Sequence, residues 1–364
     1  MKDKMIIGIL KERSDNRVAI VPATIPKLMD LKLEVLVESA AGVAALQPDE
    51  AYTSAGAKVL DRRQVMEQSD VLISIHPMSE DELKQLDKSK ILISEFQPYN
   101  DKDITGKLQA LGLRAFSMDM IPRTTLAQSM DVLSSMASIA GYRAVLEAAH
   151  HLPRFLPMMI TAAGSIKPSK VLVLGAGVAG LQAIATAKRL GASVEAFDTR
   201  VAAKEEVESL GGKFIVVEGA ADDKDAGGYA VEQSEDFIKR QRAEVQLRAS
   251  KSDIIITTAQ VRGRKAPILL PKETVDKLKK GSVIVDLATS TGGNCELSKD
   301  NEVIDYNGVT IVGSSNLADR MPEDASFLYS TNIFNFLKML VKEGEVNFDL
   351  ENEIIRGAWF THKS

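Results

Sequence analysis

The sequence predicts an α/β protein of two domains, the second of which contains a doubly wound parallel sheet. Short apolar runs alternate with helical patterns along most of the chain, as in βα units. A glycine-rich turn joins one such run to a helix near the middle of the chain. The length of 364 residues is enough for two domains of ordinary size, each with its own core.

The first domain is expected at residues 1–130, completed by residues 328–364. Apolar runs predict its strands at residues 5–10, 34–38, 57–60, 71–75, 91–95 and 114–117, with helices at residues 24–31, 50–55 and 105–111. No glycine-rich phosphate turn interrupts this alternation. A last long helix at residues 325–341 is expected to return the chain to this domain, so the domain is discontinuous in sequence.

A polar loop and a long helix follow. Residues 134–149 predict a helix rich in small residues, suited to close packing. Ahead of it, Arg123, Gln128 and Asp131 lie in a loop whose polar composition no core requires. Binding residues are common on such loops, so this loop is a candidate ligand site, and a solvated linker is the alternative.

The second domain, residues 131–327, is organised around one strand, turn, helix and strand. In order these are an apolar strand at residues 171–174, the motif G-x-G-x-x-G at Gly175, Gly177 and Gly180, a helix over residues 181–190, a strand at residues 193–197, and Asp198, 18 residues after Gly180. A lone glycine motif is weak evidence, but this order predicts a Rossmann-like dinucleotide site. A flavodoxin-like turn without a ligand is the alternative.

Each position of the motif has its own physical reason. Gly175 allows the tight turn, Gly177 lets the backbone approach a pyrophosphate, and Gly180 lets helix and strand pack closely. The amide groups of Val178 and Ala179 then lie at a helix N-terminus, where the dipole favours negative charge.

The acid at the end of the second strand indicates which dinucleotide binds. Asp198 should accept hydrogen bonds from both adenosine ribose hydroxyls and repel a 2′-phosphate, which favours NAD over NADP. Arg200 leaves open the other interpretation, because an arginine near this point can pair with a 2′-phosphate.

Residues 218–233 form an insertion far longer than the roughly 2–6 residues typical of such connections. It is acidic and glycine-rich, with Tyr229 as its one large contact group. A lid over bound nucleotide is one interpretation, and a disordered surface loop is the other. Loops after strands at residues 254–258, 283–287 and 309–312 should surround the nicotinamide half.

Composition excludes several classes of protein. Hydrophobic residues make up 45% and charged residues 26%, and the net charge of −5 gives no reason to expect nucleic acid as a partner. The one cysteine excludes an internal disulfide, and the four histidines have no ligand spacing, so no metal site is predicted. The longest charge-free run, residues 171–187, is shorter than the ~20 residues of a spanning helix, and no signal peptide is recognisable.

Five segments together resemble a known family. They are Pro122-Arg123, Ala127-Gln-Ser-Met-Asp-Val-Leu-Ser-Ser-Met136, Gly141-Tyr-Arg-Ala, residues 173–192 and Ser209-Leu-Gly-Gly-Lys-Phe. The chain resembles the NAD(H)-binding component of proton-translocating nicotinamide nucleotide transhydrogenase over nearly its whole length.

The resemblance implies an activity and partners. The chain would bind NAD(H) and exchange hydride with NADP(H) held on a separate subunit, while membrane subunits couple the transfer to proton movement. Because the chain stops without membrane helices, it resembles the split form of the family. A homodimer at the cytoplasmic face of the inner membrane is implied.

The resemblance also implies residue roles. The loop from Arg123 through Gln128 to Asp131 and Ser134 would contact the nicotinamide and its ribose and align the reaction. The implied nucleotide contacts are Arg123, Thr124, Thr125, Gln128, Gly175, Gly177, Val178, Ala179, Gly180, Asp198, Thr199, Arg200, Gly228, Tyr229, Gln241 and Gln260. The chain departs from the family pattern at Leu126, where a second arginine is usual, at Gln260 for a leucine and at Ser290 for a glutamate.

Two alternatives remain. Arg17 matches the arginine that alanine dehydrogenase, a related enzyme, uses for the substrate carboxylate. The catalytic lysine and histidine of that enzyme would fall near residues 73–75 and 96–98, where neither residue type occurs, and oxidation of an amine needs a proton acceptor. A non-catalytic NAD-binding sensor is the third interpretation.

Overall fold

The computed structural model of the chain describes residues 4–217 and 235–362. The chain divides into two compact units, unit 1 with Met1–Met136 and Ala318–Ser364, and unit 2 with Ala137–Leu317. These divisions differ from the predicted ones after residues 130 and 327. The reason is that the start of α6 (Val132–His151) and the whole of α11 (Pro322–Leu340) pack into the core of unit 1.

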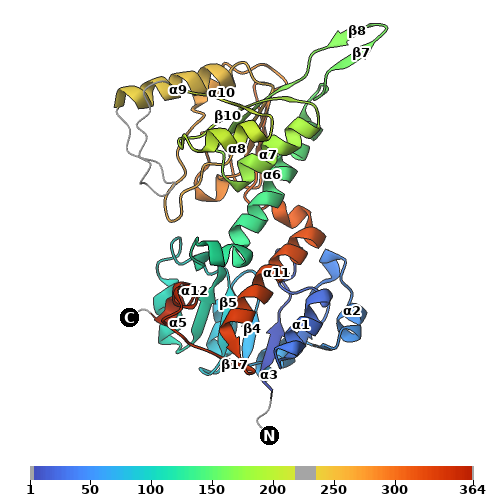
Figure 1. The fold of residues 1–364 in the computed structure, drawn as a ribbon, viewed down its shortest axis with the longest axis vertical. Coiled ribbons are helices and arrows are strands. Elements are labelled where there is room, and N and C mark those ends of the chain that lie inside the picture. Colours follow the sequence, from blue (N-terminus) through green and yellow to red (C-terminus); the bar gives the residue numbers. More distant parts are fainter. Residues whose placement is uncertain (1–3, 218–234, 363–364) are drawn as a thin grey trace. The chain divides into compact units, whose positions relative to one another are not determined.

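In the portion of unit 1 that the structure describes, six parallel strands pair in the order β3-β2-β1-β4-β5-β6 (Figure 1). They are β1 (Ile6–Ile9), β2 (Glu34–Glu38), β3 (Lys58–Leu60), β4 (Val71–Ile73), β5 (Ile91–Ser94) and β6 (Arg114–Ser117). Every strand here was predicted from its apolar run. Parallel strands buried on both faces read as such runs because neither face meets water.

Helices cover both faces of the sheet of unit 1. Alternate strand residues such as Ile7 and Ile9 join one core with α11, and Leu36 and Leu72 join a second core. The helices are α1 (Ile25–Asp30), α2 (Asp49–Ser54), α3 (Arg62–Gln68), α4 (Glu80–Gln85), α5 (Ile104–Ala110), α11 and α12 (Glu353–Ala358). The short helices α3, α4 and α12 were not predicted.

The described residues of unit 2 form a seven-stranded sheet in the order β11-β10-β9-β12-β13-β15-β14. The strands are β9 (Lys170–Leu174), β10 (Ser193–Phe197), β11 (Lys213–Phe214), β12 (Ile254–Thr257), β13 (Val283–Asp286), β14 (Val303–Tyr306) and β15 (Val309–Gly313). The helices are α6, α7 (Val178–Arg189), α8 (Ala203–Ser209), α9 (Glu235–Ala249) and α10 (Lys272–Val275). All pairings are parallel except that of β14 with β15.

The antiparallel edge strand β14 was missed in the sequence. Asn307 and Gly308 join it to β15 with φ angles of 54° and 81°. An Asn-Gly pair with both φ angles positive is the usual two-residue hairpin turn, so the signal was present. Alternating polar residues hid the strand, because one of its faces meets solvent.

A second hairpin, β7 (Met159–Thr161) with β8 (Gly164–Ile166), projects from the rest of unit 2 (Figure 1). Ile160 is 76% exposed and Met158 is 58% exposed. A hairpin that buries so little apolar surface in its own unit was not recognisable from a hydrophobic pattern. None of the helices within the described ranges is both long enough and apolar enough to span a bilayer.

Candidate functional site

The glycine turn of unit 2 lies between β9 and α7, and its three glycines differ in surroundings. Gly175 has φ +103°, and a Cβ there would lie 2.4 Å from Thr258 Oγ1. A Cβ on Gly180 would lie 1.8 Å from the carbonyl oxygen of Gly175, which no side chain permits. At Gly177, by contrast, no described heavy atom lies within 4 Å of a Cβ position. The turn and the packing therefore require glycine, while Gly177 leaves open space for a ligand.

The N-terminus of α7 opens onto this turn. Gly177 is the N-cap residue and has no side chain with which to cap the helix. The first-turn N–H groups, including those of Val178 and Ala179, therefore have no partner within the helix. The helical pattern alone placed the helix start at residue 181, but α7 begins at Val178. Such amides, with the helix dipole, favour an anion such as a phosphate.

The acid at the end of β10 organises the same turn. Asp198 Oδ2 accepts a hydrogen bond from the Ala176 amide at 2.7 Å, and Oδ1 accepts from the Arg200 amide at 2.8 Å and from Arg200 Nε at 3.1 Å. Arg200 Nη2 donates to the Ala176 carbonyl at 3.1 Å. The charge of Arg200 is therefore balanced by Asp198, and a 2′-phosphate at Arg200 would lie beside a carboxylate. Thr199, between them, is exposed.

The loops after β12 and β13 are joined by one amide side chain. Asn294 Oδ1 accepts from the Ala259 amide at 2.9 Å, and Asn294 Nδ2 donates to the Ala259 carbonyl at 2.9 Å. Gln260 Nε2 donates to the Leu287 carbonyl at 3.0 Å, which also ties the two loops together. These contacts fix the backbone beside the glycine turn, since a Cβ on Gly175 would lie 3.5 Å from the Ala259 nitrogen.

A buried carboxylate supports the second of these loops. Asp286 is fully buried and accepts hydrogen bonds from the amides of Asn294 at 2.8 Å and Cys295 at 2.9 Å and from the Ser298 hydroxyl at 2.6 Å. Cys295 is 1% exposed, and burial raises the pKa of its thiol to about 11. Sequence reasoning treated this loop as a ligand contact and missed its internal support.

The polar loop of unit 1 is a 3-10 turn, Thr125–Met130, that leads into α6. Arg123 and Gln128 are exposed. Asp131 Oδ2 accepts from the Ser134 hydroxyl at 2.6 Å and Oδ1 from the Ser134 amide at 3.0 Å, so this pair caps α6. The loop is anchored on α11, because Asn332 Nδ2 donates to the Ser129 carbonyl at 2.9 Å.

The structure places the predicted site residues in two groups. Arg123, Thr124, Thr125, Gln128, Asp131 and Ser134 belong to unit 1, and Gly175, Gly177, Val178, Ala179, Gly180, Asp198, Thr199, Arg200, Gln241 and Gln260 belong to unit 2. Within unit 2, contacts join the glycine turn with Asp198 and Arg200. Gln241 is half-buried on α9. Gly228, Tyr229 and the predicted lid at residues 218–233 lie outside the described residues.

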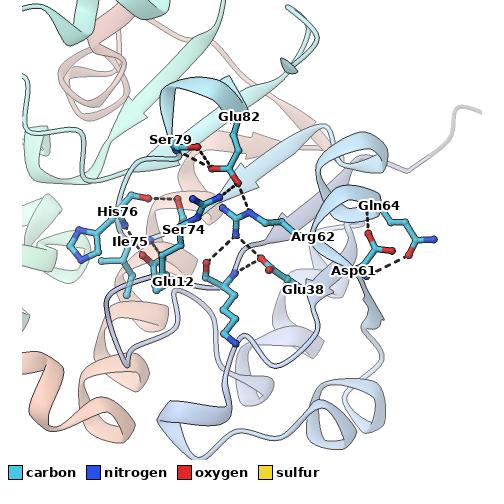
Figure 2. A network of polar contacts seen from close by, with 12 residues as sticks. Glu12, Glu38, Asp61, Arg62, Gln64, Ser74, Ile75, His76, Ser79 and Glu82 are labelled. Carbon is cyan, nitrogen blue, oxygen red and sulfur yellow. Dashed lines mark hydrogen bonds and ion pairs between the residues drawn. The ribbon is translucent and has the colours of Figure 1, made fainter. Parts of the chain in front are cut away.

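A cluster of charged side chains in unit 1 was missed in the sequence, apart from Arg17. Figure 2 shows Glu12, which follows β1, beneath the backbone of Ile75 and His76, which follow β4. Glu12 accepts from the Ile75 amide at 2.6 Å and the His76 amide at 3.2 Å, and burial raises its pKa. The available signal was that charged residues directly follow apolar strands.

Asp15 lies at the centre of this cluster. Burial alone would raise the pKa of Asp15, but hydrogen bonds from Arg17 and His76 outweigh it and hold the pKa well below its usual range. His76 Nε2 lies 2.9 Å from Asp15 Oδ2, and this bond raises the pKa of His76. Burial raises the pKa of Glu95, at the end of β5, to about 7.

Close packing also explains the Gly141 motif. A Cβ on Gly141, in α6, would lie 2.1 Å from the carbonyl oxygen of Ala179, in the first turn of α7. Glycine thus lets the two helices approach at the end where α7 presents its free amides. The motif serves the glycine turn through packing.

Comparisons with known proteins agree along the chain. The family models "Alanine dehydrogenase/PNT, N-terminal domain" and "Alanine dehydrogenase/PNT, C-terminal domain" match residues 8–140 and 144–364. The chain is 44% identical to an NAD(P) transhydrogenase subunit alpha of Rhodospirillum rubrum, the first portion of a divided subunit, over 98% of this chain and 96% of that protein. It is 25% identical to alanine dehydrogenase of Mycolicibacterium smegmatis over 93% of this chain and 88% of that one.

Solved structures give the same order of similarity. A transhydrogenase structure from Sinorhizobium meliloti matches with a TM-score of 0.89 and 41% identity, over 97% of each chain. An L-alanine dehydrogenase structure matches with a TM-score of 0.75 and 25% identity, over 92% of this chain and 90% of the other.

Proposed function

This chain belongs to the alanine dehydrogenase/PNT family, and we propose that it is the NAD(H)-binding alpha subunit of a proton-translocating NAD(P) transhydrogenase. The observation that carries the proposal is identity of 41–44% over nearly the full length to proteins of that name, against 25–26% to alanine dehydrogenases. The glycine turn of unit 2 supports a dinucleotide as its ligand.

The residues around the turn fit NAD(H). Open space at Gly177 and the free amides at the start of α7 suit a pyrophosphate, and Asp198 at the end of β10 suits the adenosine ribose diol. Asp198 would exchange some of its present hydrogen bonds for the ribose hydroxyls. The remaining proposed contacts in unit 2 are Val178, Ala179, Thr199, Arg200, Gln241 and Gln260, with Gly228 and Tyr229 on the proposed lid.

The nicotinamide of bound NAD(H) supplies or accepts the hydride. The role of Arg123, Gln128, Asp131 and Ser134 is then to bind and orient that ring and its ribose. Hydride exchange between two nicotinamides takes no proton from a substrate, so the site needs alignment of donor and acceptor carbons at ~3–3.5 Å and no general acid or base. Exposed side chains that hydrogen-bond, as Arg123 and Gln128 can, suit this requirement.

The proposed partners follow from the family. An NADP(H)-binding subunit would present the second nicotinamide, and separate membrane subunits would couple the transfer to proton movement at the cytoplasmic face of the inner membrane. We also propose a homodimer. The exposed apolar residues of the β7–β8 hairpin, among them Ile160 and Met158, support it, because a lone two-stranded hairpin is marginally stable in water.

The test compares the chain alone with the assembled enzyme. The purified chain should quench or enhance NADH fluorescence on binding, bind NADPH far more weakly, and catalyse nothing. Addition of an NADP(H)-binding subunit should start hydride exchange between NADPH and an NAD analogue. NAD-dependent oxidation of alanine by the chain alone would overturn the proposal in favour of alanine dehydrogenase. NADH binding without any exchange in the presence of the partner would favour the sensor.

A further inference from the structure

The charged cluster of unit 1 lies where doubly wound sheets bind ligands. In the order β3-β2-β1-β4-β5-β6 the winding reverses between β1 and β4, and the crevice outside the carboxyl ends at such a reversal is the usual ligand position. Asp15 and Arg17 follow β1, and His76 follows β4. A pocket of about 350 Å³ opens here, lined by His76, Glu95, Gln97 and neighbouring residues.

Arg17 is held in this crevice by one carboxylate. Its Nε donates to Asp15 Oδ1 at 2.9 Å and its Nη2 to Asp15 Oδ2 at 2.5 Å, so the contact is bidentate. The side chain of Arg17 is 5% exposed and that of Asp15 is 0% exposed. Among the residues described, no second carboxylate reaches ion-pair distance of Arg17. A paired arginine fork is also the geometry with which proteins bind free carboxylates.

Neighbouring polar atoms lack partners. Glu95 Oε1 and the Tyr329 hydroxyl are buried, and neither meets hydrogen-bond geometry with a described residue, although Tyr329 is close enough to affect the pKa of Glu95. Buried polar atoms in folded proteins are nearly always paired. The crevice therefore contains more hydrogen-bonding capacity than its own side chains use, as a ligand site does.

We propose that Asp15 is the built-in occupant of a small-carboxylate site. Its carboxylate holds the position on Arg17 that a free monocarboxylate would take, and it closes unit 1 to such ligands. Asp15 is carried by a loop after β1 and is not within the sheet, so its removal leaves the strands that frame the crevice in place. The proposal concerns unit 1 and does not depend on NAD(H) binding by unit 2.

The proposal predicts chemical rescue. Asp15→Gly removes a carboxylate the size of acetate and leaves the buried charge of Arg17 without a partner, which destabilises the fold. Formate or acetate can enter the vacated volume and restore the pairing. We expect the melting temperature of Asp15→Gly to fall by several degrees and to rise again, saturably, with sodium formate.

The measurement is thermal unfolding of the full chain in formate, acetate or chloride at equal ionic strength. The wild-type protein should respond alike to all three salts. The matched control is Glu38→Ala, because Arg62 keeps Glu82 at 2.6 Å when Glu38 is lost (Figure 2). This control should show no rescue by formate beyond that by chloride. Retained NADH binding checks that the variants are folded.

A second variant covers the case in which Asp15→Gly does not fold. Asp15→Asn keeps the shape and removes the charge, and line broadening of ¹³C-acetate in NMR spectra should appear with this variant and be absent with wild type. Equal stabilisation of Asp15→Gly by formate and chloride would overturn the proposal. Acetate binding to the wild-type chain as tight as to Asp15→Asn would also overturn it, because Asp15 would then exclude nothing.

Discussion

The two units build the same kind of parallel sheet and finish its carboxyl edge in opposite ways. In unit 2 the edge at β9 consists of backbone, with three glycines and the uncapped start of α7. In unit 1 the corresponding edge at β1 is filled by the side chains of Glu12, Asp15, Arg17 and His76, which pair with one another. A winding reversal thus creates a crevice in both units, and the residues that follow the first strand decide whether it stays open.

The strongest way to break this contrast is to put a side chain on the open edge. In Gly180→Ala the new Cβ would collide with the Gly175 carbonyl, so we expect a loss of about 1–3 kcal/mol in unfolding free energy and loss of NADH binding. Gly177→Ala is the matched variant, since its Cβ meets open space. It should unfold as wild type does and still bind NADH more weakly. Unaltered stability of Gly180→Ala by calorimetry would contradict the packing argument.

The closed edge should reveal itself through pH. Burial raises the pKa of Glu95 from 4.5 to about 7, so the folded chain keeps a proton that the unfolded chain has released. Stability therefore falls as pH rises from about 4.5 to about 7, by about 1.4 kcal/mol for each unit. Glu95→Gln should remove this dependence. Denaturant unfolding of both proteins between pH 4.5 and 8 measures it, and parallel curves would argue against a buried, protonated Glu95.

The one acid on the open edge should sharpen ligand selectivity. Asp198→Ala should weaken NADH binding by about 1.5–3 kcal/mol, the range for hydrogen bonds to a charged group, and narrow the preference over NADPH. Glu195→Gln on the same strand is the control, because Glu195 pairs with Arg248 on α9. Isothermal titration of both nucleotides gives the affinities. Equal wild-type affinities for NADH and NADPH would refute the assignment.

The smallest effect is expected in the polar loop of unit 1. Gln128→Asn shortens an exposed side chain by one methylene, so NADH affinity should change little. The hydride step in the assembled enzyme should slow more than binding weakens, because alignment is more sensitive than affinity to a small displacement. Single-turnover kinetics with NADPH and an NAD analogue separate the two. Wild-type rates would remove Gln128 from its proposed role.

The open edge was predictable from the sequence, and the closed edge largely was not. The glycine motif names its own geometry, because only glycine allows the φ angle at Gly175 and the contact at Gly180. The closed edge depends on pairs such as His76 with Asp15, whose positions are 61 apart in the chain. Nothing in the local pattern specifies such a pair, so the sequence indicated the strands and Arg17 without their contacts. The family itself was predicted from its motifs and is confirmed.

Cys295 is the chain's one cysteine, and its buried thiol has practical value for these measurements. A thiol with a pKa near 11 that is 1% exposed stays protonated and shielded at neutral pH, so maleimides should not label the native protein. A cysteine introduced on the surface would then carry a fluorophore or spin label at a single known position without removal of the native residue. Distances between the two units could be measured in solution from such labels, with and without nucleotide.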